Sequence, residues 1–516
     1  MLIGGTIAIQ DLLPQLKLHL LPAAREFIPA FLLPAPPAPV AQPAKAAEPL
    51  FAGRDTHLKN FYRKLAQLKN GRRERVRVMH FGDSVIWYER VARDLRAGLM
   101  RDFGDGGRGQ VIMHDDWGIS LFGHERLNKN GFEFETIPFN HFNHAEPKWL
   151  PSTGFSGWTY RAKSFLAQTV QRAPPHAAAF TQLNLILRAA PGAAPRQTIR
   201  VTSYDSSTAP AAIADSTVTL KADSCSMHSI PIPPTRHIGV NFGDSGQPQQ
   251  KSAYLDAVLL ETDRGVSYST YIQKGRHMAW MTAITPSTFD CGYQAMQPDL
   301  LVFQYGINES ASIDWKAYGF SPENYRKQMR DFFGRLRRAL PETDVLIIGP
   351  YERLKKIGDR WVTYKAHDDV RQMQRDMAQE MGFAYFDSYA YLGGAGHMER
   401  MTREGLATGD YSHLNDKGSA ILGTAIYKEL YAGYSGKSSP GSAPIAAADT
   451  SAPSPILFNS LTFAYFFILV FVVAAFLNRF PGARLIFLTL ISWYFYASWR
   501  YWALGLMLFS TGIDYL

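Results

Sequence analysis

Three polar residues that lie far apart in the chain have the types needed for serine-based ester chemistry. Ser84 follows Gly82 and Asp83 directly after an alternating apolar segment, and Asp410 and His413 lie close together downstream. A serine hydroxyl is a weak nucleophile until a base takes its proton, and an imidazole oriented by a carboxylate does this near neutral pH. We therefore predict that Ser84 is the nucleophile, His413 the general base and Asp410 the residue that orients His413.

The same chemistry needs hydrogen-bond donors for the negative charge that develops on the ester oxygen during attack. Asn308 follows a predicted strand at residues 300–305, where its side-chain amide can donate to that oxygen. The backbone N–H of Ser84 can supply a second donor. We predict that both groups belong to an oxyanion hole.

Three blocks that contain these residues occur in the order found in a known family. Gly-Asp-Ser at residues 82–84, Gly-Ile-Asn-Glu at 306–309 and Asp-Tyr-Ser-His at 410–413 resemble blocks of the SGNH, or GDSL-type, hydrolases. Glu309 is a departure, because the family more often has Asp at this place. The resemblance implies a flavodoxin-like α/β fold with a parallel sheet and helices on both faces. We expect neither a cofactor nor a metal.

The family also uses a glycine N–H as an oxyanion donor, and two glycines compete for this role. Gly275 lies in a segment that resembles the family's peptidoglycan O-acetylesterase-like branch, although Lys274 stands where that branch usually has Asn. Gly157 is the alternative. We favour Gly275, because it follows the β-rich part of the chain and precedes Asn308 by 33 residues.

The elements that must position these residues alternate between strands and helices. Apolar runs predict buried strands at 76–81, 300–305, 345–348 and 383–386, and helical patterns occur at 322–340, 365–381 and 416–431. Strands that alternate with helices form a parallel sheet covered on both faces, and active sites lie at the carboxyl ends of such strands. Ser84 and Asn308 both follow predicted strands, so we expect them at the same edge.

Changes in composition and in the strand and helix patterns divide the chain into six segments. We predict an apolar, proline-rich segment and linker at 1–50, the first part of the hydrolase domain at 51–114, an inserted β-sandwich-like, carbohydrate-binding-like module at 115–265, the second part of the hydrolase domain at 266–434, a linker at 435–455, and a transmembrane region at 456–516. The module would make the catalytic domain discontinuous in sequence.

The C-terminal tail has the composition of membrane-spanning segments. Residues 461–477 carry no charge, two further apolar stretches follow, and Trp and Tyr gather at their boundaries. Arg479 and Arg484 lie in the first short loop, which predicts that this loop is cytoplasmic and that the catalytic domain faces the periplasm or cell exterior. The tail also resembles the opening of a membrane-bound O-acyltransferase (MBOAT), so we interpret the chain as a fusion protein cut short, which contacts membrane lipid.

Composition limits the partners and the redox chemistry. The 516 residues include 54 basic and 45 acidic residues, a net charge of +9, which suits a polyanionic glycan or anionic lipid and equally a plain soluble surface. No nucleic-acid motif is present, so we expect no nucleic-acid partner. Cys225 and Cys291 can form one disulfide, but we favour two unrelated free thiols.

Several other polar residues are weaker functional candidates. His124, His141 and His144 lack the spacing of a metal site, so we interpret them as surface or packed histidines. His80 is interpreted as a packing residue. Asp387 follows a strand and competes with Asp410, but a helix cap or a place at the sheet edge suits it better.

Two functions follow from these observations. The first is an extracytoplasmic serine esterase or O-acetyltransferase that acts on O-acyl, above all O-acetyl, groups of a bacterial cell-surface polysaccharide or peptidoglycan. The second is a non-catalytic glycan-binding or assembly subunit of a polysaccharide O-acetylation system. The presence of Ser84, Asn308, Asp410 and His413 favours the enzyme.

Overall fold

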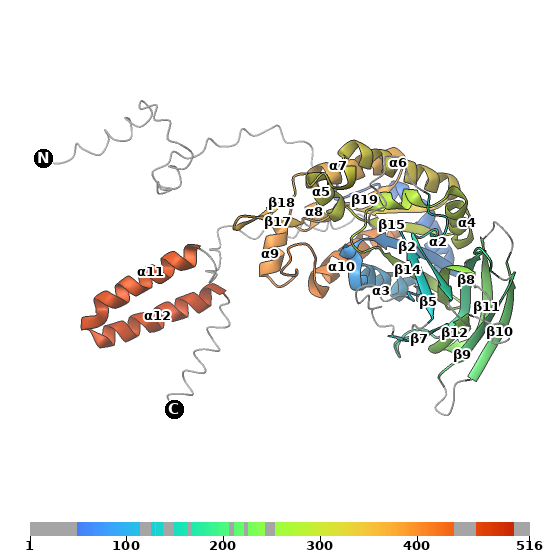
Figure 1. Cartoon of the computed structure of the whole chain (residues 1–516), viewed down its shortest axis with the longest axis horizontal. Coiled ribbons are helices and arrows are strands. Elements are labelled where there is room, and N and C mark those ends of the chain that lie inside the picture. The colour runs from blue at the N-terminus through green and yellow to red at the C-terminus, as the bar shows by residue number, and fades with distance from the viewer. Residues whose placement is uncertain are drawn as a thin grey trace. The chain divides into compact units, whose positions relative to one another are not determined.

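The computed structural model describes the chain from residue 49 to residue 499 with internal gaps. The described ranges are 49–113, 125–128, 131–137, 149–162, 167–193, 195–205, 211–220, 225–242, 253–437 and 461–499. Figure 1 shows an α/β part, a β-rich part and two C-terminal helices.

A six-stranded sheet forms the centre of the α/β part. Its order is β1 (Phe51–Ala52), β19 (Ala384–Phe386), β16 (Asp344–Ile348), β15 (Leu300–Gln304), β2 (Arg75–Gly82) and β14 (Gly265–Ile272). Only β1 runs antiparallel to its neighbour in this sheet. The predicted parallel sheet is confirmed, and β2, which precedes Ser84, occupies an interior position between β14 and β15.

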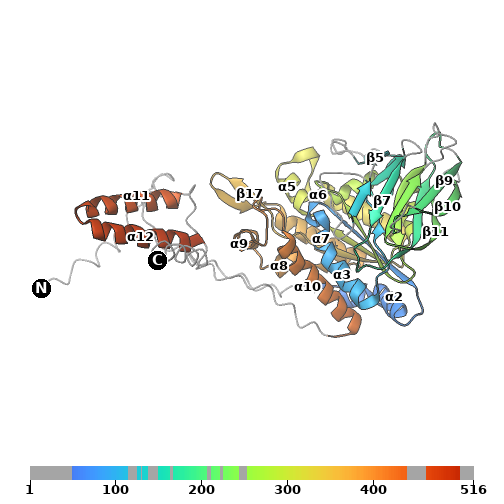
Figure 2. The ribbon, with the colours of Figure 1, turned by 90° about the horizontal axis from the view of Figure 1, so that it is seen from below.

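Helices cover both faces of this sheet, as predicted (Figure 2). The first face carries α2 (Lys59–Lys69), α3 (Ala92–Phe103) and α10 (Asp416–Ser435), and the second carries α4 (Pro286–Met296), α6 (Pro322–Ala339) and α7 (His367–Met381). Strand β2 explains the division. Its Val76 and Val78 pack in the core of the first face, whereas Met79 and Phe81 pack in the core of the second, because successive side chains of a strand point to opposite faces.

The β-rich part consists of two largely antiparallel sheets that share one core. The first has the order β10 (Ala211–Thr219), β9 (Arg196–Ser203), β12 (His237–Phe242), β7 (Gln168–Arg172) and β4 (Glu125–Asn128). The second has the order β11 (Cys225–Thr235), β8 (Phe180–Arg188), β13 (Tyr254–Glu261), β6 (Trp158–Ala162) and β5 (Phe132–Thr136), and the short β3 (Gly109–Gln110) pairs with β13. Val201 and Leu185, one from each sheet, belong to the same hydrophobic cluster, which is the arrangement of a sandwich.

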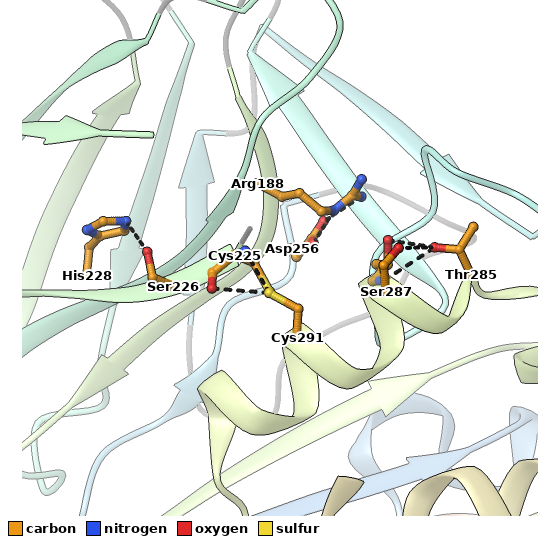
Figure 3. The surroundings of a disulfide bond; sticks show 9 residues. Arg188, Cys225, Ser226, His228, Asp256, Thr285, Ser287 and Cys291 are labelled. Atoms are coloured by element: carbon orange, nitrogen blue, oxygen red, sulfur yellow. Dashed lines mark hydrogen bonds and ion pairs between the residues drawn. A yellow bond between two sulfur atoms is a disulfide. The ribbon is translucent and has the colours of Figure 1, made fainter. Parts of the chain in front are cut away.

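A disulfide links the β-rich part to the α/β part. It joins Cys225, the first residue of β11, to Cys291 of α4, and the two Cα atoms lie 5.7 Å apart (Figure 3). The favoured interpretation as two free thiols is therefore wrong. The two residues are 66 positions apart, and nothing in the local sequence shows that β11 lies against α4.

The described C-terminal residues form α11 (Leu461–Phe476) and α12 (Pro481–Trp499), which run side by side in Figure 1. Within the described ranges, no helix is both long enough and apolar enough to cross a membrane. Part of the predicted transmembrane region, including its third apolar stretch, lies outside those ranges. The membrane-spanning tail stays a prediction.

Candidate active site

The predicted nucleophile lies at a sharp strand-to-helix turn. Strand β2 ends at Gly82, and Ser84 begins the short helix η3 (Ser84–Glu89). A side chain at Gly82 would lie 2.9 Å from the Gln304 carbonyl oxygen, so glycine permits the close approach of β15. The Asp83 carboxylate accepts a 2.9 Å hydrogen bond from the Val85 N–H and thereby caps the turn. The turn holds the Ser84 side chain at the carboxyl edge of the sheet.

The structure brings Ser84, His413 and Asp410 together in a hydrogen-bonded chain. The Ser84 Oγ lies 2.8 Å from His413 Nε2, and His413 Nδ1 lies 2.6 Å from Asp410 Oδ2. The second carboxylate oxygen of Asp410 accepts hydrogen bonds from the Thr408 hydroxyl and from the Ser412 and His413 N–H groups, at 2.6, 3.0 and 3.2 Å. This is the geometry in which an imidazole can remove the proton of a serine.

The electrostatics of Asp410 suit this role. Partial burial raises the pKa of Asp410. The hydrogen bonds from His413 and Thr408 lower it by more than burial raises it, so the net pKa is well below its usual range. The carboxyl group is therefore ionised at any pH at which the enzyme works. An ionised Asp410 accepts the Nδ1–H of His413 and leaves Nε2 free to act as the base.

Sequence reasoning missed the hairpin that holds the loop of the triad. The Tyr411 backbone has a positive φ of 52°, and its carbonyl accepts a 3.0 Å hydrogen bond from the N–H of Leu354. Leu354 begins β17 (Leu354–Ile357), which pairs with β18 (Arg360–Thr363), and Trp361 of β18 stacks on Tyr411 with ring centres 4.2 Å apart. The hairpin thus stabilises an unfavourable backbone conformation between Asp410 and His413.

Asn308 lies beside the serine because β15 pairs with β2. Gln304 is opposite Gly82, and the chain then enters α5 (Ile307–Asp314), which begins next to Asn308. The Asn308 amide nitrogen donates to Asp83 Oδ2 at 3.0 Å and lies 3.3 Å from the Arg276 carbonyl oxygen. Its Oδ1 accepts from Arg353 at 3.3 Å. Arg353, which sequence reasoning also missed, therefore helps to set which way the amide faces.

The two candidate glycines occupy different environments. Gly275 lies in the turn after β14, whose last residue Ile272 is opposite Gly82, and its N–H has no acceptor among the described residues. The positive φ of 71° at Gly275 favours glycine. Gly157 is buried, and its N–H donates to the Gly154 carbonyl at 3.0 Å. Of the two, only Gly275 has an N–H available at the edge that carries Ser84.

The structure gives the remaining candidates other surroundings. His80 is buried, its Nδ1 lies 2.8 Å from the Tyr268 hydroxyl, and burial lowers its pKa to about 3. Asp387 accepts from the Ala390 N–H as the cap of α8 (Ser388–Tyr391) and pairs with two arginines. His124, His141 and His144 lie outside the described residues. No cluster of metal-binding side chains occurs in the ranges that the structure describes.

We expect substitution of Asn308 by alanine to lower kcat by about 10²-fold or more while KM changes little, because an oxyanion donor acts mainly in the transition state. The substitution Asn324→Ala is the matched control, because Asn324 is an exposed residue of α6. Steady-state hydrolysis of an acetyl ester measures both effects. A rise in KM at unchanged kcat would assign Asn308 to ground-state binding instead.

Glu309, the departure from the family pattern, is fully buried beside Asn308. It accepts a 2.9 Å hydrogen bond from the Met278 N–H, and burial raises its pKa from 4.5 to about 7. Its other carboxyl oxygen has no hydrogen-bond partner among the described residues. The folded protein therefore favours the protonated, uncharged form of Glu309.

The raised pKa of Glu309 predicts a loss of stability as pH increases. A carboxyl whose folded-state pKa exceeds its unfolded value stabilises the fold below pH 4.5, and this contribution disappears as pH rises through about 7. The shift corresponds to about 3 kcal/mol. We expect Glu309→Gln, which mimics the protonated form, to be more stable than the wild type at pH 8 and nearly equal at pH 4.5, as measured by urea unfolding. An identical pH dependence in both proteins would contradict this assignment.

The fold and the hydrogen-bonded site define a serine ester hydrolase. Residues 238–421 match the model of the GDSL-like Lipase/Acylhydrolase family. The matched segment contains Asn308, Asp410 and His413, whereas Ser84 precedes it. The part of the catalytic domain that follows most of the β-rich part is thus similar to the GDSL-like acylhydrolases, and the proposed nucleophile Ser84 lies before the matched segment.

One solved structure shares the fold of most of this chain, and two others are similar over smaller parts of it. A peptidoglycan O-acetylesterase superposes with a TM-score of 0.60 at 18% sequence identity, covering 75% of this chain and 99% of that one. A putative GDSL-like lipase from Parabacteroides merdae gives a TM-score of 0.27 at 15% identity, over 33% of this chain and 74% of that one. The acetylxylan esterase Axe2 from Geobacillus stearothermophilus gives 0.25 at 16% identity, over 32% and 73%. No curated protein matches the sequence.

Proposed function

We propose that the protein removes or transfers O-acetyl groups on a bacterial cell-surface polysaccharide or peptidoglycan, outside the cytoplasm. The observation that carries the proposal is the continuous chain of hydrogen bonds from Ser84 through His413 to Asp410. The structural likeness to a peptidoglycan O-acetylesterase, which extends over the β-rich part as well as the catalytic domain, supports the choice of an acetylated glycan.

The mechanism follows from the arrangement of the side chains. His413 takes the Ser84 proton while the serine oxygen attacks the acetyl carbonyl, and the resulting oxyanion is stabilised by the Ser84 N–H, the Gly275 N–H and the Asn308 amide. His413 then protonates the leaving sugar oxygen, which leaves an acetyl-serine. Either water or another sugar hydroxyl attacks this intermediate, with His413 again as the base. The first outcome is an esterase and the second an acetyltransferase.

Aromatic side chains on two sides of the site are consistent with a sugar substrate. Trp87 and Tyr88 follow Ser84 and stack with ring centres 4.4 Å apart, and the Lys274 ammonium lies 3.5 Å from the centre of the Trp87 ring. Trp361 and Tyr411 stack beside Asp410 and His413. Flat aromatic faces with a nearby polar group provide an apolar surface for a sugar ring and a hydrogen-bonding group at its edge.

The proposed location outside the cytoplasm is supported by two observations. The Cys225–Cys291 disulfide is typical of an oxidising compartment. The apolar sequence of the C-terminal tail and its arginine-containing loop favour a membrane anchor that leaves the catalytic domain outside. The resemblance of that tail to the opening of an MBOAT protein favours the transferase, because such a partner region can deliver acyl groups to Ser84.

The decisive experiment incubates the full chain with an acetylated glycan, and separately with an acetyl donor and a deacetylated glycan. Free acetate without new glycan ester indicates an esterase, and acetate transferred to the glycan indicates a transferase. The rival function, a glycan-binding subunit without catalysis, predicts that neither product forms and that a fluorophosphonate probe does not label Ser84. Labelling of the wild type above the level of Ser84→Ala would exclude that rival.

A further inference from the structure

A cavity of about 550 Å³ lies between α3 and a loop of the β-rich part. Helix α3 contributes one wall, residues 105–108 contribute the floor, and the loop around His176, which precedes β8, closes the other side. Four arginines line the cavity: Arg93, Arg96, Arg101 and Arg108. No residue of the proposed triad or oxyanion hole is among its lining residues.

Two buried arginines of the cavity share one buried carboxylate. Arg96 and Arg108 are 8% and 3% exposed, and both pair with the fully buried Glu89. Arg96 forms a bidentate pair with both Glu89 oxygens at 3.0 Å, whereas Arg108 reaches only Oε1, at 2.7 Å. In the direct ion pairs two guanidinium groups share this one carboxylate, and the Asp105 carboxylate also acts on Arg96 without a direct ion pair. Buried charge without a counter-charge is costly, so this arrangement favours an anion.

Arg108 has donors that the protein does not use. Its Nε and Nη1 are buried and have no hydrogen-bond acceptor among the described residues. Burial lowers its pKa to about 10, although Glu89 opposes this effect. These unused N–H groups can each donate a charge-assisted hydrogen bond to an oxygen of a carboxylate or phosphate.

The rim of the cavity differs from the floor. Arg93 and Arg101 pair with the adjacent Asp94 and Asp102, both at 2.9 Å. Asp105 is the carboxylate among the lining residues, and it accepts hydrogen bonds from the Gly107 and Ala178 N–H groups. Asp105 thereby connects the two walls of the cavity. At the floor, by contrast, Arg108 shares the Glu89 carboxylate with Arg96.

Strand register gives the distance of the cavity from the serine. Asp105 forms a bridge with Val266 at the beginning of β14, where Val76 is opposite, whereas Ser84 follows Gly82 at the other end of β2. The six residues from Val76 to Gly82 span about 20 Å. The bridge at Asp105 therefore lies about 20 Å from Gly82 along the strands, whereas Glu89 lies closer to it, because Glu89 accepts from the Thr270 hydroxyl and Thr270 is opposite His80. Several sugar units of one glycan chain can bridge this range of distances.

We propose that this cavity is an anion-binding subsite that takes a carboxylate or phosphate group of the glycan chain, held by Arg108 and Arg96. The anion accepts hydrogen bonds from the unused donors of Arg108 and adds a second negative charge beside the two arginines that share Glu89. The assignment of the anion to a glycan rests on the proposed function, whereas anion binding by the cavity does not. The subsite selects acidic polymers and leaves the chemistry at Ser84 unchanged.

The test uses the full chain with Ser84→Ala, which prevents turnover, and titrates it at constant ionic strength. The probes are inorganic phosphate, an oligogalacturonate and a neutral chito-oligosaccharide. We expect phosphate and oligogalacturonate to bind, and Arg108→Met to weaken both by about tenfold or more, because a charged hydrogen-bonded pair is lost. Arg108→Met leaves Arg96 and Glu89 as a balanced pair, so the variant should fold. Arg101→Gln at the rim should weaken binding by about threefold at most.

The outcomes separate the subsite from the proposed function. Equal anion binding by Arg108→Met and by its parent would overturn the subsite, as would equal binding of the neutral oligosaccharide. Phosphate binding without oligogalacturonate binding would overturn its assignment to a glycan. Hydrolysis of a small acetyl ester is a measurement that does not depend on the subsite, so Arg108→Met should retain this activity. If Arg108→Met loses anion binding and, with Ser84 intact, still hydrolyses the ester, the subsite is supported. If the wild type itself does not hydrolyse the ester, the proposed function is refuted and the subsite is not.

Discussion

Replacement of Ser84 by alanine is expected to lower kcat for an acetyl ester by about 10⁴-fold or more. The side chain provides the oxygen that forms the acyl-enzyme, and no other hydroxyl can replace it, because His413 Nε2 is hydrogen-bonded to this oxygen. The remaining rate would come from the oxyanion donors alone. The fold should be unaffected, because Ser84 lies in a turn that Asp83 caps.

The measurement combines steady-state hydrolysis with labelling by a fluorophosphonate probe. Ser84→Ala should lose both activities, whereas Ser287→Ala, at an exposed serine of α4, should keep both. A Ser84→Ala variant that still hydrolyses the ester at more than a few per cent of the wild-type rate would refute the nucleophile assignment.

The substitution Asp410→Asn should lower kcat by about 10⁴-fold with little change in structure. An asparagine that donates its amide N–H toward Nδ1 would force the proton of His413 onto Nε2, where the base must be free. The low pKa of Asp410 keeps the wild-type carboxylate ionised throughout the working pH range, so the substitution removes the same hydrogen-bond acceptor at every pH. Activity at neutral pH and at higher pH should therefore be reduced alike.

Asp387→Asn is the comparison that distinguishes catalysis from structure. Asp387 pairs with Arg371 and Arg375 at 2.8 and 2.6 Å, so its loss should reduce the free energy of unfolding. At a temperature where the variant stays folded, its kcat should remain within a few fold of wild type. If Asp387→Asn removed activity while Asp410→Asn did not, the assignment of the triad carboxylate would be reversed.

The parallel sheet was predictable from the alternation of strand and helix patterns. The proximity of Ser84, Asn308 and Asp410 was predictable because each of these residues lies shortly after a predicted strand or shortly before a predicted helix. Parallel pairing then brings strand ends to one edge, whatever the sequence distance between them. The predicted strands at 300–305 and 345–348 also end within one residue of β15 and β16, since both contain continuous apolar runs. These properties depend on local patterns alone.

The features that sequence reasoning missed depend on contacts between distant segments. Arg353 lies directly before the hairpin and Trp361 lies in it. The residues of this segment form no recognisable motif, and the signal could only have been their position after the strand at 345–348. The disulfide was missed because its two cysteines come from different layers. The unused donors of Arg108 have no local signature either, since its partner Glu89 lies 19 residues earlier.

The interior position of β2 has a consequence for the order of folding. Both neighbours of β2, namely β14 and β15, follow the β-rich part, so β2 waits for more than 180 residues before it can pair. His413 joins later still, from the other end of the domain. Contacts of such long sequence separation form late and slowly. A partly made or partly exported chain therefore holds its serine without a base, and the nucleophile becomes reactive only once the whole catalytic domain has been assembled.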